Sequence, residues 1–259
     1  MERRVSAHAG GPLRLVTASA GNHGRALAFA AAARGLHVTV YAAENAPRTK
    51  LDAIRALGAD LRLCRNYDDA ERAAKQHAAG GDAAFISPYS DDDVIAGAGT
   101  VGLEILADRP DVECVVVPVG GGGLISGIAI AAAGAARRVE VAGVEAEASQ
   151  PFTQSRMAGR IVSVDVRPTL ADGLAGNLDP DTVTFEIVQR LVPRIVTVPE
   201  EELKDAMRGI VEQERLVAEG AAAVGVAAVA SLRIEGRGRC MAIVLSGGNV
   251  DSSVLKSML

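Results

Sequence analysis

The chain contains 259 residues, of which 49% are hydrophobic and 3% aromatic, and its formal net charge at pH 7 is -5. This length allows one large domain or two modest ones, and we expect two, with interiors of Ala, Val, Leu and Ile packed between helices and strands. The acidic balance and the scattered arginines argue against nucleic acid as a partner. The longest apolar stretches, residues 124–136 and 218–232, are shorter than the ~20 residues of a membrane-spanning helix.

The first third of the chain alternates short strands with helices. Strands are predicted at residues 13–17, 38–42, 61–64 and 83–86. Helices are predicted at residues 25–34, from the position after Pro47 to residue 57, and at residues 67–79. Glycines at positions 35 and 58 follow two of these helices, as is typical of helix ends. The pattern indicates βαβ units around a mainly parallel sheet.

The same alternation continues after three consecutive aspartates at positions 91–93, where we place the boundary between a small domain, residues 1–93, and a large domain, residues 94–259. A helix to residue 107, a strand at 114–119, a helix at 124–134 and a strand at 139–145 are predicted. Residues 150–180 have weak periodicity and many turn residues, so we expect irregular structure there. Helices at 182–191, 200–212 and 221–232, strands at 195–198 and 241–245, and a short helix from about residue 251 complete the chain.

Three strand-to-helix turns have unusual compositions. The Ser19 turn is Ser19-Ala20-Gly21-Asn22-His23-Gly24, the tetraglycine turn is Gly120-Gly121-Gly122-Gly123, and the Ser246 turn is Ser246-Gly247-Gly248-Asn249. In doubly wound sheets, such turns at the carboxyl ends of strands present backbone N–H groups and helix N-termini to ligands.

The tetraglycine turn is the most informative of the three. Without side chains, several amides can converge on a phosphate, and the dipole of the following helix favours its negative charge. A flexible connector is the plain alternative, but each glycine costs about 0.5–1 kcal/mol relative to alanine in regular structure. We therefore favour a phosphate-binding turn.

A nicotinamide dinucleotide site is a competing interpretation. Glu145 ends the strand that follows the tetraglycine turn, where dinucleotide-binding domains place a ribose-binding acid. The spacing does not fit, because Ile125 and Ser126 stand where the third glycine of G-x-G-x-x-G would fall.

The other two turns have structural alternatives. The Ser19 turn offers a hydroxyl, a carboxamide, an imidazole and glycine amides, which suit an amino-acid carboxylate. Ser19 or Asn22 could instead cap the next helix, and His23 could equally be structural. The Ser246 turn could be an ordinary turn with Asn249 as its cap.

Taken together and in this order, the turns belong to a longer set of motifs that extends over most of the chain. The set is Thr17-Ala18-Ser19-Ala20-Gly21-Asn22-His23-Gly24, Ile95-Ala96-Gly97-Ala98-Gly99-Thr100, Val117-Pro118-Val119 with the four glycines and Leu124, Ala171-Asp172-Gly173, Ala218-Glu219-Gly220, and Leu245-Ser246-Gly247-Gly248-Asn249-Val250. It resembles the fold-type II pyridoxal-5′-phosphate (PLP) enzymes, specifically the threonine/serine dehydratase (ammonia-lyase) and serine racemase group.

The resemblance implies an α/β, tryptophan synthase beta-like fold of two parallel-sheet domains with flanking helices. It also implies that Asn22 contacts the ring hydroxyl of PLP, that the tetraglycine turn binds its phosphate, and that Ser246 faces the pyridine nitrogen. Ser19, Ala20, Gly21, Asn22 and His23 would hold the substrate carboxylate. The implied reaction is β-elimination from a β-hydroxy amino acid to a 2-oxo acid and ammonia, in a cytoplasmic homo-oligomer.

One element of the family pattern is missing. The family's Schiff-base lysine follows Ser-Phe, upstream of the first turn, and none of the four lysines here, Lys50, Lys75, Lys204 and Lys256, stands in such a motif. We therefore expect no catalytic residue of this kind, an N-terminally truncated large domain, and an inactive chain. A PLP- or ligand-binding pseudoenzyme is the alternative.

Two further positions depart from the resemblance. Ala20 stands where the racemases carry a serine acid, which favours dehydration over racemisation. Glu147 and Pro151 match part of the family's Mg²⁺ or Ca²⁺ site, but Thr153 replaces an aspartate, and hard cations need several oxygen ligands. A weakened cation site is expected.

Overall fold

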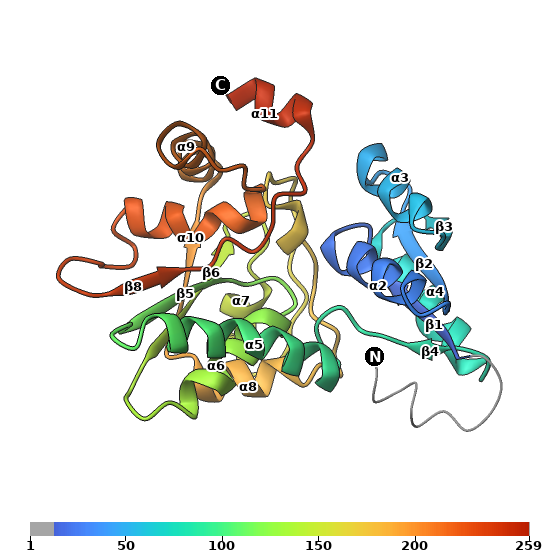
Figure 1. Cartoon of the computed structure of the whole chain (residues 1–259), viewed down its shortest axis with the longest axis horizontal. Coiled ribbons are helices and arrows are strands. Elements are labelled where there is room, and N and C mark those ends of the chain that lie inside the picture. The colour runs from blue at the N-terminus through green and yellow to red at the C-terminus, as the bar shows by residue number, and fades with distance from the viewer. Residues whose placement is uncertain (1–12, 259) are drawn as a thin grey trace. The chain divides into compact units, whose positions relative to one another are not determined.

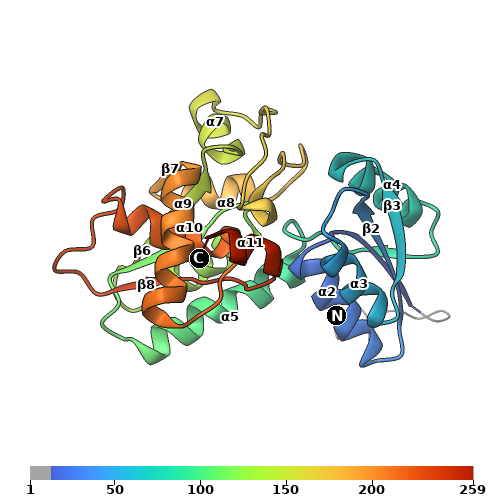
Figure 2. The ribbon, with the colours of Figure 1, turned by 90° about the horizontal axis from the view of Figure 1, so that it is seen from above.

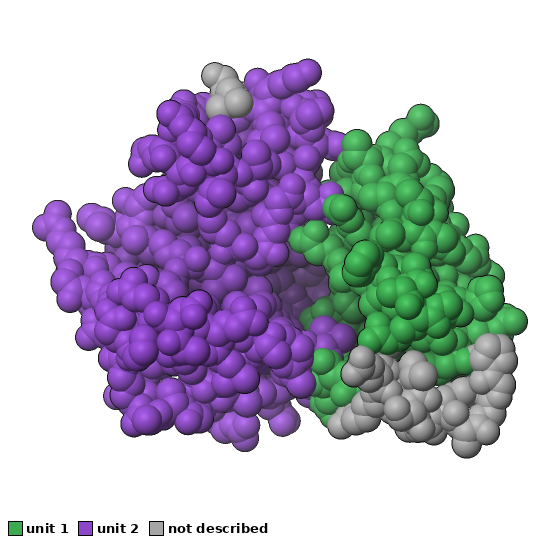
Figure 3. Space-filling view, in the orientation of Figure 1, with its two compact units in different colours: residues 1–93 green, residues 94–259 purple. Residues whose placement is uncertain are grey.

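The computed structural model describes residues 13–258, and these form two compact units, which Figure 3 colours separately. One unit is Met1–Asp93 and the other is Val94–Leu259. Among residues 13–258, no helix combines the length and apolar character that a membrane crossing needs.

The first unit is built on a parallel four-stranded sheet of order β3-β2-β1-β4. Its strands are β1 (Arg14–Ala18), β2 (His37–Ala43), β3 (Asp60–Cys64) and β4 (Ala84–Phe85), and its helices are α2 (Asn22–Ala32), α3 (Arg48–Ala56) and α4 (Tyr67–Ala79). Helix α4 packs on the sheet through a cluster in which Val16 and Ala18 meet Ala70 and Ala74. These elements lie at the predicted places.

The second unit contains a parallel four-stranded sheet of order β7-β6-β5-β8. The strands are β5 (Cys114–Pro118), β6 (Glu140–Ala146), β7 (Arg194–Val198) and β8 (Met241–Ile243). The helices are α5 (Asp92–Asp108), α6 (Gly123–Ala133), α7 (Pro151–Ala158), α8 (Thr184–Leu191), α9 (Glu200–Gly209), α10 (Gly220–Ala230) and α11 (Ser252–Met258), with a 3₁₀ turn η1 (Asp172–Leu174) and a π-helical turn η2 (Ile210–Glu214).

Alternate residues of β5 pack on opposite faces of this sheet, because successive side chains of a strand point in opposite directions. Cys114 and Val116 join the core formed with α9 and α10, whereas Val115 and Val117 join the core formed with α6 and α8. In Figure 1, α9 and α10 lie above the sheet and α6 and α8 lie below it, and Figure 2, seen from above, shows α9 and α10 in front. A strand buried on both faces explains the unbroken apolar run in the sequence.

Two predictions for this unit were inaccurate. Residues 150–180 were expected to be irregular, but α7 lies within them. The helix expected at residues 200–212 ends as α-helix at Gly209 and continues as η2, after which Arg215 has φ 58°.

Candidate active site

The tetraglycine turn and the Ser246 turn lie at the same edge of the second unit's sheet. The first follows β5 and the second follows β8, and these strands are parallel neighbours, with Val116 opposite Ile243. Because the carboxyl ends of parallel strands meet at one edge, the fold brings together two turns that are more than a hundred residues apart in sequence.

The tetraglycine turn requires glycine for steric reasons. Gly122 has φ +85°, in the left-handed region, and a Cβ atom there would lie 2.5 Å from Cζ of Phe152. At Gly120, a Cβ atom would lie 3.1 Å from Cα of Leu174. Any side chain at Gly122 would therefore displace the turn or α7, which carries Phe152.

The amides of this turn remain available to a ligand. Helix α6 begins at Gly123, no side chain caps it, and no acidic residue lies in its first turn. The first N–H groups of an α-helix have no acceptor within the helix, and the helix dipole favours an anion at this end. A phosphate fits this set of donors without competition from the chain's own carboxylates.

Thr184 fixes the orientation of one peptide in the turn. Its hydroxyl donates a hydrogen bond of 2.8 Å to the carbonyl oxygen of Gly121. Because the C=O and N–H of a trans peptide point in opposite directions, the amide of Gly122 points away from Thr184.

The Ser246 turn is held by the segment that precedes α10. The carbonyl oxygen of Gly247 accepts a hydrogen bond of 3.1 Å from the amide of Glu219, and a Cβ atom at Gly248 would lie 2.7 Å from the carbonyl oxygen of Val217. The backbone is thus fixed while Ser246 itself is exposed.

The motifs at residues 171–173 and 218–220 pack against each other beside these turns. A Cβ atom at Gly220 would lie 2.1 Å from the carbonyl oxygen of Leu170, and one at Gly173 would lie 3.1 Å from Cβ of Ala221. Since Leu174 also contacts Gly120, both motifs support the tetraglycine turn.

The Ser19 turn lies at the carboxyl end of β1 in the first unit. The Ser19 hydroxyl accepts a hydrogen bond of 3.2 Å from the amide of Gly21, and Asn22 is exposed at the start of α2. The N-cap residue of α2 is Gly21, which has no side chain that could cap the helix.

The imidazole of His23 forms a hydrogen bond within the first unit. Its Nε2 lies 3.1 Å from the hydroxyl of Thr17, and that hydroxyl donates to the carbonyl oxygen of Ile86. Since the only proton of Thr17 is used, Nε2 must be the donor to Thr17. Burial lowers the pKa of His23 to about 4, so the ring is neutral at pH 7.

Glu145 was the candidate ribose-binding acid of a dinucleotide site, but its carboxylate caps the N-terminus of α7. The carboxylate is fully buried, and it accepts hydrogen bonds from the amide of Phe152 (2.8 Å), the amide of Thr153 (2.9 Å) and the hydroxyl of Thr153 (2.6 Å). Burial raises the pKa of Glu145 to about 7, although the bonds from Thr153 and Phe152 oppose this shift.

The predicted cation site does not fit the structure. The hydroxyl of Thr153 is donated to Glu145, and the exposed carboxylate of Glu147 lies 4.0 Å from Arg167. Within the described part of the chain, no three His, Cys, Asp or Glu side chains cluster as such a site requires, and we assign no role to a cation.

All four lysines lie on helices, and none of them follows a Ser-Phe pair. Lys50 is in α3 and Lys75 in α4, where Lys75 pairs with Glu71 at 3.4 Å. Lys204 in α9 pairs with Glu201 at 3.1 Å, and Lys256 lies in α11.

A parallel α/β unit with a glycine-rich helix N-terminus beside a Ser-Gly-Gly turn is typical of enzymes that bind a phosphate-containing cofactor. Residues 1–247 match the family model described as "Pyridoxal-phosphate dependent enzyme", and the chain belongs to this family. The predicted fold is thereby confirmed.

Curated relatives and solved structures agree with this assignment. The chain is 45% identical over 246 residues to the L-threonine ammonia-lyase of Thermotoga maritima, covering 95% of this chain and 61% of the relative. It is 43% identical over 238 residues to that of Geobacter sulfurreducens, covering 92% and 59%. The chain thus spans about three fifths of the length of these relatives.

Two solved structures have the same fold. The processed form of threonine deaminase isoform 2 from Solanum lycopersicum superposes with a TM-score of 0.85 at 32% identity, covering 94% of this chain and 72% of that one. Maize serine racemase gives 0.86 at 31% identity, covering 94% and 75%.

Proposed function

We propose that the chain provides the PLP-binding residues of a threonine/serine ammonia-lyase, which converts a β-hydroxy amino acid into a 2-oxo acid and ammonia. The observation that carries this proposal is the uncapped, glycine-only N-terminus of α6 beside the Ser246 turn. The family and the names of the two relatives support the reaction class. When bound, PLP withdraws electrons from the Cα of an attached amino acid, so that a β-substituent can leave.

Each residue then has a binding or orienting role. The amides at the start of α6 would bind the phosphate, and Asn22 would donate to the ring hydroxyl. Ser246 would face the ring nitrogen, where a neutral hydroxyl does not stabilise a positive charge as a carboxylate does. The Ser19 hydroxyl and the amides of residues 20–23 would hold the substrate carboxylate, because the His23 ring is committed to Thr17.

Dehydration is favoured over racemisation at this site. The racemase group carries a serine at the position of Ala20, and a methyl group cannot transfer a proton. The substrate class is therefore a β-hydroxy amino acid that loses its hydroxyl. The free thiols Cys64, Cys114 and Cys240 suit the proposed cytoplasmic location, and a homo-oligomer stays a prediction.

The proposal is tested by titrating the purified chain with PLP and following the cofactor's absorbance. Gly122→Ala should bind PLP about tenfold more weakly or worse, because the phosphate loses charge-assisted hydrogen bonds. Gly134→Ala, at the other end of α6, is the matched control, since its Cβ atom would meet nothing closer than 3.5 Å. Ser246→Ala, at an exposed position, tests the site without threatening the fold.

Three results would contradict the proposal. If Gly122→Ala and Ser246→Ala both bound PLP with unchanged affinity, the two turns would not form the PLP site. Binding of NADH in place of PLP would favour the nicotinamide interpretation, and binding of neither would favour a non-catalytic module.

A further inference from the structure

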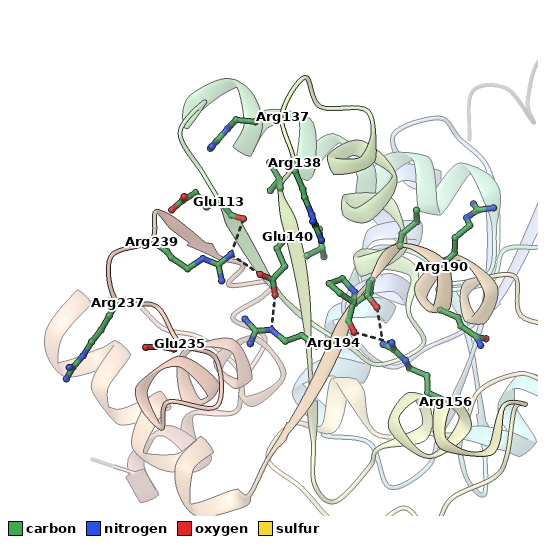
Figure 4. Close-up of a pocket in the computed structure, with 16 residues that line it drawn as sticks. Glu113, Arg137, Arg138, Glu140, Arg156, Arg190, Arg194, Glu235, Arg237 and Arg239 are labelled. Carbon is green, nitrogen blue, oxygen red and sulfur yellow. Dashed lines mark hydrogen bonds and ion pairs between the residues drawn. The ribbon is translucent and has the colours of Figure 1, made fainter.

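A pocket lies at the edge of the second unit's sheet opposite to the tetraglycine and Ser246 turns. It is a depression of about 1180 Å³ formed around the amino ends of β5, β6, β7 and β8. Seven arginines and three glutamates line it, and Figure 4 shows their side chains around the opening. The formal charge of this lining is +4, from seven positive and three negative groups, in a chain whose net charge is -5. We call it the arginine pocket.

Two of the three glutamates are already engaged. Glu140 forms ion pairs with Arg194 at 2.9 Å and with Arg239 at 2.8 Å. Glu113 accepts a hydrogen bond of 3.0 Å from the amide of Cys240. The ion pairs of Glu140 engage one negative and two positive charges, so five arginines and two glutamates of the lining lie outside this cluster.

Two further arginines contact only neutral acceptors. Arg156 donates to the carbonyl oxygens of Val192 (3.1 Å) and Pro193 (3.4 Å), and Arg137 donates to that of Val112. A carbonyl oxygen positions a guanidinium without neutralising its charge, so these hydrogen bonds leave both arginines charged in the lining of the pocket; Arg156 also interacts electrostatically with Glu145.

Three arginines have no partner at all among residues 13–258. Arg138 lies between α6 and β6, Arg190 lies in the last turn of α8, and Arg237 lies before β8, and none of them forms an ion pair or a side-chain hydrogen bond there. Because like charges repel, gathering such groups costs free energy unless an anion balances them. Their donors are free to bind one.

We propose that the arginine pocket binds a compact polyanion of the oligophosphate class. The guanidinium fork matches phosphate oxygens in pairs, and the uncompensated charge calls for a ligand with several negative groups. The arginines come from separate elements around a depression, which suits a small molecule better than the linear stripe that follows a nucleic acid.

This pocket is distinct from the proposed cofactor site. It lies beside the residue before β5, whereas the tetraglycine turn begins two residues after that strand. At ~3.3 Å per residue, the seven steps from Glu113 to Gly120 span about 23 Å. One small ligand cannot contact both.

The test is isothermal titration of the whole chain with inorganic tripolyphosphate at low ionic strength. We expect saturable binding, which the double variant R138A/R190A weakens by about tenfold or more, because two charge-assisted contacts are lost. R48A/R55A, which also removes two positive charges but from α3 of the other unit, should lower the affinity much less. Orthophosphate should bind about tenfold more weakly than tripolyphosphate, because one phosphate group forms fewer charge-assisted contacts.

The possible outcomes separate this proposal from the cofactor site. PLP affinity should be unchanged in R138A/R190A, and tripolyphosphate affinity should be unchanged in Ser246→Ala. A titration without saturation, or equal losses in R138A/R190A and R48A/R55A, would show general charge attraction and overturn the proposal.

Discussion

Glu145 gives the chain a pH-dependent contribution to stability at a single residue. Its carboxyl is fully buried at the N-terminus of α7, and burial raises its pKa to about 7. A folded-state pKa above the unfolded value means that the folded form binds the proton more tightly. The associated stability is complete below about pH 4.5 and is lost as the pH rises toward 7. The loss is at most about 3 kcal/mol.

We predict that Glu145→Gln flattens this pH dependence. Urea unfolding at pH 5, 6 and 7 should show a falling free energy for the wild type and a lower but nearly constant one for the variant. Glu147→Gln is the matched control, because Glu147 follows the same strand but is exposed, and it should keep the wild-type slope. If the free energy of unfolding of Glu145→Gln fell as steeply with pH as that of the wild type, the pH dependence would come from other groups.

At the scale of elements, glycines set the distance between α5 and α6. A Cβ atom at Gly127 would lie 2.4 Å from the carbonyl oxygen of Ile95 and 2.5 Å from the amide nitrogen of Gly99. The backbones of the two helices therefore touch, and this contact fixes the helix that begins at the tetraglycine turn. The motif at residues 95–100 thus has a packing role.

We predict opposite effects for two alanine substitutions in this pair of helices. Gly127→Ala should destabilise the chain by at least about 2 kcal/mol, because it overpacks a backbone contact. Gly97→Ala, where a Cβ atom meets nothing within 4 Å, should stabilise it by about 0.5–1 kcal/mol through reduced unfolded-state entropy. Urea denaturation measures both, and similar effects of the two substitutions would contradict the close crossing.

Elements with strong local signals could be predicted from the sequence, and α7 could not. The tetraglycine turn and the apolar strand β5 have distinctive compositions. Helix α7 is short, and its stability comes from the Glu145 cap and from burial of Phe152 against Gly122. Both are tertiary contacts, which residue periodicity does not report.

At the scale of the whole molecule, several arginines gather at one edge of a sheet, which their order in the sequence does not reveal. They are scattered in sequence, but parallel strands bring the segments before β6, β7 and β8 to one edge, where Arg138, Arg194 and Arg239 meet. The usable signal was their position just before, or at the start of, predicted strands.

The whole chain should bind PLP reversibly, because none of its four lysines occupies the motif that forms the covalent link. Lys75 and Lys204 form ion pairs on helices, and Lys50 and Lys256 also lie within helices. We predict that borohydride treatment of the PLP-saturated chain leaves its intact mass unchanged, and that serine or threonine yields no 2-oxo acid. An added mass that maps to one lysine would instead identify a covalent anchor, and turnover with threonine would show that this anchor also removes the Cα proton.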